Sequence, residues 1–124
     1  MARILVAEDN PTVRAFVERA LGQAGHEVVN AVDGLAALTV LEGAPFDLLL
    51  TDIVMPGLDG IALALRVTRD YPEMRVLLMT GFAAERQRAH NLEALVHRVI
   101  EKPFTLKQIC AAVADELAAS RGGA

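Results

Sequence analysis

The sequence predicts an α/β fold in which helices cover both faces of a doubly wound, five-stranded parallel sheet. Short apolar runs alternate with helical patterns along the chain, which is typical of repeated βα units. The apolar runs contain few polar residues, as strands buried on both faces do, and right-handed crossovers place helices on both sides of such a sheet. The 124 residues suffice for one core of this kind but are about half of what a closed eight-unit barrel requires.

The individual elements are predicted from hydrophobic period and from Gly and Pro stop signals. Asn10 can cap a helix that has Pro11 at its first position, and apolar residues then recur at helical spacing up to Gly25. The predicted strands are Arg3 to Ala7, Glu27 to Ala31, Phe46 to Thr51, Arg75 to Thr80 and Val96 to Glu101. One helix is predicted after Asn10, a second from Gly34 to Glu42 and a third from Ile61 to Asp70. The last predicted helix has an apolar stripe formed by Leu106, Ile109, Cys110, Val113 and Leu117.

Two segments depart from this pattern. Between the fourth and fifth strands, Phe82 to Leu95 contains the run Glu85 to Asn91, which has almost no apolar face, so we expect a short and mobile helix there. The Gly-rich tail Ser120 to Ala124 is expected to be flexible. Because the chain has no internal repeat and no interior linker, residues 1–119 are expected to form a single domain.

The composition excludes several functional classes. A net charge of −4 provides no general attraction to nucleic-acid backbones, and no apolar run is long enough to cross a membrane. The N-terminal apolar run stops at Glu8 and is too short for a signal peptide. Cys110 is the single cysteine, so no intramolecular disulfide can form. We therefore expect a cytoplasmic protein without a direct nucleic-acid or membrane partner.

Polar and charged residues stand at the ends of four of the five predicted strands. Glu8 and Asp9 follow the first strand, and Asp52 follows the third. The fourth strand ends at Thr80, and Lys102 follows the fifth. In doubly wound sheets, ligands bind beyond the carboxyl ends of the strands. If these four strands are neighbours, three carboxylates, a hydroxyl and an ammonium meet at one edge.

This set of residues indicates metal-assisted phosphoryl chemistry. Three carboxylates in one site repel each other and raise their pKa values unless a cation neutralises them. Oxygen ligands without His or Cys favour Mg²⁺, which completes its octahedron with waters and a phosphate oxygen. Asp52 is the candidate nucleophile that receives a phosphoryl group, and Lys102 would neutralise the charge that develops on the transferred oxygens.

Each of these residues has an ordinary explanation when it is taken alone. Glu8 and Asp9 suit the positive end of a helix, and Asp52 could begin a turn. Thr80 could bond to its own backbone, and Lys102 could be solvated at the surface. The coincidence of all these residues at strand ends favours the functional interpretation.

The strand-end residues belong to a set of longer motifs. These are Ile4 to Asn10, Asp47 to Pro56 with Asp59–Gly60, Thr80, and Lys102–Pro103–Phe104. Together they resemble the receiver domain of two-component response regulators, the CheY-like family, over essentially the whole chain. The resemblance implies a flavodoxin-like (βα)5 fold with strand order 2-1-3-4-5. It further implies a stand-alone receiver that is a phosphoprotein in phosphorelay signal transduction.

The resemblance also implies which residues bind the metal ion. Asp52 corresponds to the phosphoacceptor of the family and, with Asp9, to a Mg²⁺ ligand. Glu8 corresponds to a ligand that acts through water, and Val54 to a ligand that uses its backbone carbonyl. Mg²⁺ is therefore the expected cofactor.

The same resemblance implies a phosphorylation-dependent switch. Lys102 would pair with the phosphoryl group, Thr80 would be the switch hydroxyl, and the Lys102–Pro103 peptide would be cis. The phosphoryl donor would be a sensor histidine kinase or a histidine phosphotransfer protein, and the output would reach an unidentified downstream protein. The protein is not expected to be an enzyme beyond self-catalysed phosphotransfer and autodephosphorylation.

One position departs from the family pattern. Receiver domains usually carry Tyr or Phe three residues before the Lys, and this chain has Val99 there. Phe82, close behind Thr80, is a candidate substitute. The segment around Thr80–Gly81–Phe82 and the motif from Thr51 to Pro56 are also similar to a stand-alone receiver that controls substrate delivery to an ATP-dependent protease.

Two other functions remain open on the sequence alone. A phosphatase of the haloacid-dehalogenase type would place a second Asp two residues after the nucleophile, where this chain has Val54. A degenerate receiver that acts as a phosphorylation-independent interaction module is suggested by Val99, although Asp9, Asp52 and Lys102 are intact. Nucleotide binding is disfavoured because the chain has neither a P-loop nor a dinucleotide fingerprint.

Overall fold

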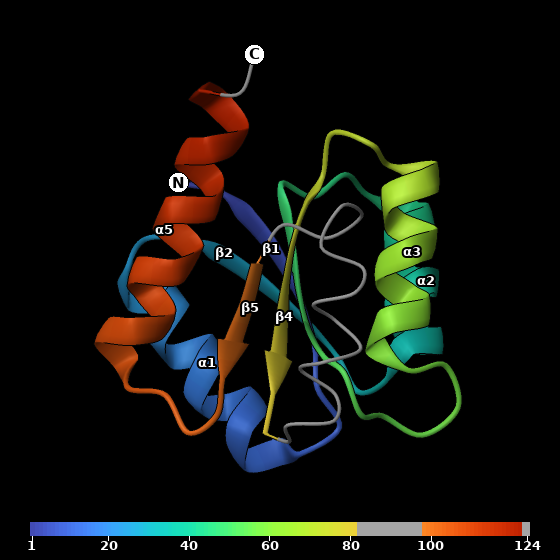
Figure 1. Ribbon diagram of the computed structural model, residues 1–124, viewed down its shortest axis with the longest axis horizontal. Coiled ribbons are helices and arrows are strands. Elements are labelled where there is room, and N and C mark those ends of the chain that lie inside the picture. The colour runs from blue at the N-terminus through green and yellow to red at the C-terminus, as the bar shows by residue number, and fades with distance from the viewer. Residues whose placement is uncertain (82–97, 123–124) are drawn as a thin grey trace.

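The described residues form one parallel sheet with helices on both faces (Figure 1). The computed structural model describes residues 1–81 and 98–122, and its strand order is β2-β1-β3-β4-β5. The strands are β1 (Arg3–Ala7), β2 (Glu27–Ala31), β3 (Leu48–Asp52), β4 (Arg75–Thr80) and β5 (Arg98–Glu101). The helices are α1 (Pro11–Gln23), α2 (Gly34–Gly43), α3 (Gly60–Asp70) and α5 (Leu106–Gly122). Helices α1 and α5 lie on one face and α2 and α3 on the other, which confirms the predicted doubly wound fold and strand order.

The central strands are buried on both faces, as their apolar sequences predict. Because side chains alternate between the two faces of a strand, each strand contributes to two separate layers of core. Val6, Leu50 and Leu77 pack with residues of α1 and α5. Leu5 and Leu49 pack with residues of α2 and α3, and all five side chains are completely buried. A slip of one residue would exchange the two layers, so this burial fixes the register of the strands.

The bounds of β3 differ from the prediction. The strand begins at Leu48 and ends at Asp52, whereas the sequence predicted Phe46 and Thr51. Phe46 lies instead beneath the guanidinium of Arg3, which is 4.7 Å from the ring centroid. At its other end the strand continues in register with β4 through Asp52. Asp52 therefore belongs to the sheet, which holds this residue more rigidly than a loop would.

Helix α5 is longer than expected. It continues to Gly122, beyond the domain boundary expected at residue 119, and Ala118 and Ala119 favour this continuation because alanine has the highest helix propensity. The flexibility expected for residues 120–124 stays a prediction. The expected mobile segment Phe82 to Leu95 and the start of the expected strand at Val96 lie outside the described residues. Within the described ranges, no helix has both the length and the hydropathy that crossing a bilayer requires.

All four described helices follow strand ends at the carboxyl edge of the sheet and begin with side-chain caps. Oδ1 of Asn10 accepts hydrogen bonds from the N–H groups of Thr12 and Val13 at 2.9 and 3.2 Å. Asp33 and Asp59 cap α2 and α3 in the same way. For α5, Oγ1 of Thr105 accepts a hydrogen bond from the N–H of Gln108 at 3.0 Å. Each cap satisfies N–H groups that have no partner within the helix. The caps therefore determine where the chain turns from strand to helix, and so position the residues between them.

Candidate functional site

The carboxyl edge of the sheet brings together residues that are far apart in the sequence. Glu8 follows β1, Asp52 ends β3, Thr80 ends β4 and Lys102 follows β5. These four strands are neighbours in the sheet, so their carboxyl ends share one edge. Glu8 and Lys102, which are 94 positions apart, form a direct hydrogen bond there. The structure thus gathers the residues that the sequence placed at strand ends.

Three carboxylates form an acidic cluster at this edge. One oxygen each from Glu8, Asp9 and Asp52 lies within 4.8 Å of the other two. Glu8 and Asp52 are buried, whereas Asp9 is exposed to solvent. Hard carboxylate oxygens without nitrogen or sulfur ligands are the donor set that Mg²⁺ prefers. The residues present therefore fit the metal ion that the sequence predicts.

Glu8 is the most deeply buried carboxylate of the cluster. Its side chain has no exposed surface. Oε1 accepts a hydrogen bond from Lys102 Nζ at 2.8 Å, and Oε2 accepts one from the N–H of Asn10 at 3.1 Å. Burial raises the pKa of Glu8 and the charge of Asp52 adds to this rise, although the bonds from Lys102 and Asn10 oppose it. This carboxylate therefore depends on nearby positive charge to remain ionised.

Lys102 supplies that charge and connects two carboxylates. Its Nζ lies 2.8 Å from Glu8 Oε1 and 3.2 Å from Asp52 Oδ2. Burial by itself lowers the pKa of Lys102, but the hydrogen bond with Glu8 and the charge of Asp52 outweigh burial and raise this pKa. The backbone N–H of Lys102 donates to the carbonyl of Thr80 at 2.7 Å. The Lys102–Pro103 peptide is cis, as the family resemblance implies.

Asp52 is held firmly at both carboxylate oxygens. Oδ1 accepts a hydrogen bond from the N–H of Ile53 at 3.0 Å, while Oδ2 faces Lys102. The residue is 8% exposed, so the protein surrounds most of it. Behind it, Gly60 at the start of α3 comes so close that an added Cβ would overlap the carbonyl oxygen of Asp52. The N–H of Gly60 also donates to the carbonyl of Ile53 at 2.8 Å, which closes the turn.

A second close approach holds the loop that follows Asp52. A Cβ on Gly34, the first residue of α2, would overlap the carbonyl oxygen of Leu58. The loop between β3 and α3 is therefore pressed against the N-terminus of α2. Val54 lies in this loop with 48% of its surface exposed, and the use of its carbonyl as a metal ligand stays a prediction.

The residues implied in the switch occupy β4 and β5. Thr80 is 1% exposed at the end of β4, and its role as a switch hydroxyl stays a prediction. Val99 is partly buried on β5 and packs against the core cluster that α2 and α3 cover. Phe82, the suggested substitute for the missing aromatic residue, lies outside the described residues.

Arg14 is a residue at the site that sequence reasoning missed. It lies in α1, and its Nη1 donates a hydrogen bond to the backbone carbonyl of Glu8 at 2.7 Å. A search for polar residues at the ends of strands does not find Arg14, because this residue lies inside a helix. The close approach of Gly60 to Asp52 was also missed, although Gly60 belongs to one of the family motifs.

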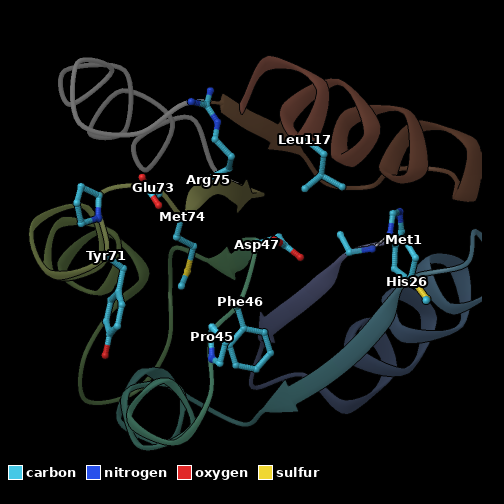
Figure 2. A pocket seen from close by; sticks show the side chains of 12 residues that line it. Met1, His26, Pro45, Phe46, Asp47, Tyr71, Glu73, Met74, Arg75 and Leu117 are labelled. Carbon is cyan, nitrogen blue, oxygen red and sulfur yellow. Dashed lines mark hydrogen bonds between the residues drawn. The ribbon is translucent and has the colours of Figure 1, made fainter. Parts of the chain in front are cut away.

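A concavity lies at the opposite end of the molecule (Figure 2). It has a volume of about 900 Å³. Its lining includes His26, Phe46, Asp47, Tyr71 and Arg75. His26, Asp47 and Arg75 stand at the amino ends of β2, β3 and β4. Because all strands are parallel, the length of the sheet separates this concavity from Asp52, and it is not part of the acidic site.

Comparisons with known proteins support a single family. The model of the response regulator receiver domain matches residues 4–114. The response regulator receiver protein CpdR of Brucella abortus (strain 2308) is 42% identical over 109 residues, which are 88% of this chain and 91% of that protein. The transcriptional regulatory protein TcrA of Mycobacterium tuberculosis (strain H37Rv) is 34% identical over 88% of this chain but only 43% of its own length.

Solved structures agree with this assignment. The response regulator TrrA of Thermotoga maritima, in complex with Mg²⁺ and BeF, is 26% identical with a TM-score of 0.84 and covers 93% of this chain and 98% of its own. A CheY-like receiver from Methanospirillum hungatei has a TM-score of 0.91 over 100% of this chain and 99% of its own, and at 24% identity it supports the fold alone. With the receiver model spanning residues 4–114, the chain belongs to the response regulator receiver domain family.

Proposed function

We propose that this receiver accepts a phosphoryl group on Asp52 in a Mg²⁺-dependent reaction. The observation that carries the proposal is the Lys102 ammonium, held 2.8 Å from Glu8 and 3.2 Å from Asp52 beside the three-carboxylate cluster. A fixed cation next to an anchored carboxylate is suited to stabilise charge that develops during phosphoryl transfer. Asp52 ends a fully buried strand, so the nucleophile and the cation are positioned before a donor arrives.

The chemical step follows from this arrangement. A carboxylate oxygen of Asp52 attacks the phosphorus of a phosphohistidine, the P–O bond forms and the P–N bond breaks; the bonding electron pair stays on the ring nitrogen, and a proton on the ring, taken up from solvent, leaves the histidine as neutral imidazole. Glu8, Asp9 and Asp52 would hold Mg²⁺, which when bound neutralises charge on the phosphoryl oxygens. Lys102 supplies the second positive charge, and Glu8 keeps it protonated and aimed at Asp52.

The product would act as a switch within the domain. An aspartyl phosphate carries about −1.5 to −2 charges at pH 7 and three strong acceptor oxygens. Thr80 ends the neighbouring strand, and its hydroxyl is the proposed donor to one of these oxygens. The energy of that new bond would favour one arrangement of the β4 and β5 ends over another.

The partners follow from the same chemistry. The phosphoryl donor would be a sensor histidine kinase or a histidine phosphotransfer protein, and the output would be an unidentified downstream protein in the cytoplasm. Because the phosphoryl group is received by the protein itself and lost by hydrolysis, we propose a signalling switch and not an enzyme that turns over small substrates. The hydrophobic Val54, in place of a second acid, supports this view.

The intact mass of the protein after incubation with acetyl phosphate tests the proposal. We expect a gain of one phosphoryl group with Mg²⁺, no gain with EDTA, and no gain in Asp52→Asn. Asp47→Asn is the matched control, because Asp47 is an exposed acid at the other end of β3, and it should be phosphorylated normally. Wild-type protein that is folded, binds Mg²⁺ and gains no phosphoryl group would contradict the proposal and favour a phosphorylation-independent interaction module.

A further inference from the structure

We infer that Arg14 is a positioning residue for the cation site, acting through the peptide that links Glu8 to Asp9. Its guanidinium reaches back from α1 and donates a hydrogen bond to the carbonyl of Glu8 at 2.7 Å. The bond is partly buried, so water competes for that carbonyl less than at the surface. The inference rests on the proposed function, because it concerns the residues that would hold Mg²⁺.

Asp9 is the carboxylate that needs this support. The other two acids are tied by their own side chains, since Glu8 bonds to Lys102 and Asn10, and Asp52 to Lys102 and Ile53. Asp9 is exposed, and among the described residues its carboxylate has no hydrogen bond or ion pair. Its direction therefore depends on the backbone that carries it.

Arg14 determines the orientation of that backbone. The N–H of Glu8 donates to the carbonyl of Ala31 on β2 at 3.1 Å, which fixes the chain before the peptide. The carbonyl of Glu8 and the N–H of Asp9 lie in one rigid plane, because a peptide bond does not rotate freely. The bond from Arg14 to this carbonyl thus fixes the rotation of the plane and, with it, the direction in which Asp9 points.

The charge of Arg14 and its proposed positioning role predict opposite changes in Mg²⁺ affinity when this residue is replaced. A positive guanidinium beside the cluster repels a divalent cation, so removal of the charge alone would strengthen Mg²⁺ binding. Loss of an outer-shell hydrogen bond that orients a ligand instead weakens metal binding, by about 10–100-fold in other metal sites. The sign of the change in affinity therefore separates the two explanations.

Titration calorimetry with MgCl2 on the full chain tests the inference. We expect Arg14→Met to bind Mg²⁺ about tenfold more weakly than wild type. Arg19→Met is the matched control, because Arg19 is an exposed residue of the same helix, and its affinity should be unchanged. In an Asp9→Asn background, Arg14→Met should cause no further loss, since its effect passes through Asp9.

Phosphorylation by acetyl phosphate provides a second measurement. In Arg14→Met, the Mg²⁺ concentration for half-maximal phosphorylation should rise by the same factor, while the rate at saturating Mg²⁺ stays near that of wild type. A general loss of structure would lower the rate at all concentrations, and circular dichroism in EDTA checks the fold. If Arg14→Met does not fold, Arg14→Ala replaces it, because alanine favours the helix and carries no side-chain donor, and this variant should also bind Mg²⁺ more weakly.

The outcomes distinguish this inference from the proposed function. Equal or tighter Mg²⁺ binding by Arg14→Met overturns the role of Arg14, even if Asp52 is phosphorylated normally. A wild-type protein that binds Mg²⁺ but is never phosphorylated overturns the proposed function, while weaker binding by Arg14→Met would still support the positioning role. A wild-type protein that binds no Mg²⁺ at millimolar concentrations overturns the inference.

Discussion

Gly60 lies directly against the backbone carbonyl of Asp52, so close that no side chain fits between them. Gly60 is the first residue of α3, and Asp52 is the last residue of β3. Its N–H completes the turn by donating to the carbonyl of Ile53. The start of a helix and the proposed phosphoacceptor therefore share one backbone contact, and a change in either displaces the other.

Gly60→Ala is expected to lower the free energy of unfolding by about 1–3 kcal/mol, because the new methyl group must push α3 away from β3. Phosphorylation by acetyl phosphate should also slow, since Asp52 moves with the strand end. Gly22→Ala is the control, because an added Cβ there meets nothing within 4 Å, and it should be neutral or stabilising by about 0.5–1 kcal/mol. Urea unfolding of both variants checks the difference, and equal stabilities would contradict the contact.

Lys102→Met is expected to destabilise the protein in EDTA by about 2 kcal/mol at pH 7. Glu8 has no exposed surface and would lose its counter-charge, although the cost is below the ~3–5 kcal/mol of a fully buried pair because Lys102 is 23% exposed. The pKa of Glu8 should rise further, since the bond from Lys102 lowers it, so the loss of stability should shrink as pH falls and Glu8 takes up a proton.

Urea titrations at several pH values measure this effect. The double variant Lys102→Met with Glu8→Gln should recover most of the stability, because no buried charge remains. Lys107→Met serves as the control, since Lys107 is exposed on α5. If Lys102→Met were as stable as Lys107→Met, the ion pair would have no measurable role.

Asp9→Asn is expected to stabilise the metal-free protein and to remove its response to Mg²⁺. In EDTA, removal of one of three clustered charges relieves repulsion worth on the order of 1 kcal/mol, a small value because Asp9 is exposed. Wild type should gain about 2.7 kcal/mol at a Mg²⁺ concentration 100 times its Kd, and the variant should gain little.

Thermal unfolding in EDTA and in MgCl2 therefore should show a reversed order of stability for the two proteins. Glu42→Gln, which changes an exposed acid on α2, should behave as wild type in both buffers. An equal Mg²⁺ response of wild type and Asp9→Asn would exclude Asp9 from the metal site.

His26 should make the stability depend on pH. Its Nδ1 accepts a hydrogen bond from the N–H of Ala2 at 3.2 Å, which requires the neutral ring. Burial lowers the pKa of His26 from 6.5, and the positive N-terminal amino group adds to the effect. Just below pH 6.5 the unfolded chain therefore binds more protons at His26 than the folded protein does. The stability that neutral His26 contributes is complete above that pH and is lost as the pH falls through the pKa of His26 in the folded protein.

His26→Gln should flatten this part of the pH profile. Denaturant unfolding of wild type and variant at pH values from about 7.5 to about 5.5 measures the two slopes. The difference between them isolates His26, because the carboxylates titrate alike in both proteins. Identical slopes would show that the hydrogen bond to Ala2 does not discriminate between the charged and neutral ring.

Much of the fold could be predicted from local pattern. The Asn10–Pro11 cap predicted the start of α1, because capping acts between near neighbours in the sequence. The apolar run predicted β1, because a strand buried on both faces needs apolar side chains throughout. The start of β3 was wrong, because Phe46 is apolar like the strand but lies beneath Arg3, and a contact between distant residues leaves no periodic signal. The strand order came from family resemblance and not from the pattern.

The candidate site was predictable where it follows from topology. Parallel strands end at one edge, so Asp52, Thr80 and Lys102 could be placed together from the ends of their strands. The direct bond between Lys102 and Glu8 could not be predicted, because it depends on how far a flexible side chain reaches and on the complete burial of its partner. The bond from Arg14 is of the same kind, since it connects a helix to a strand end through space.

The two glycines at the starts of α2 and α3 make the surroundings of Asp52 more rigid on the side of these helices. Gly34 and Gly60 bring these helices into backbone contact with the chain from Asp52 to Leu58, where close packing resists any shift. On the other side of Asp52, the connection to β5 runs through the long and flexible side chain of Lys102. Asp52 therefore has backbone contacts with α3 on one side and with β4 in the sheet, whereas among the described residues only the Lys102 side chain, which can change rotamer, connects it to β5.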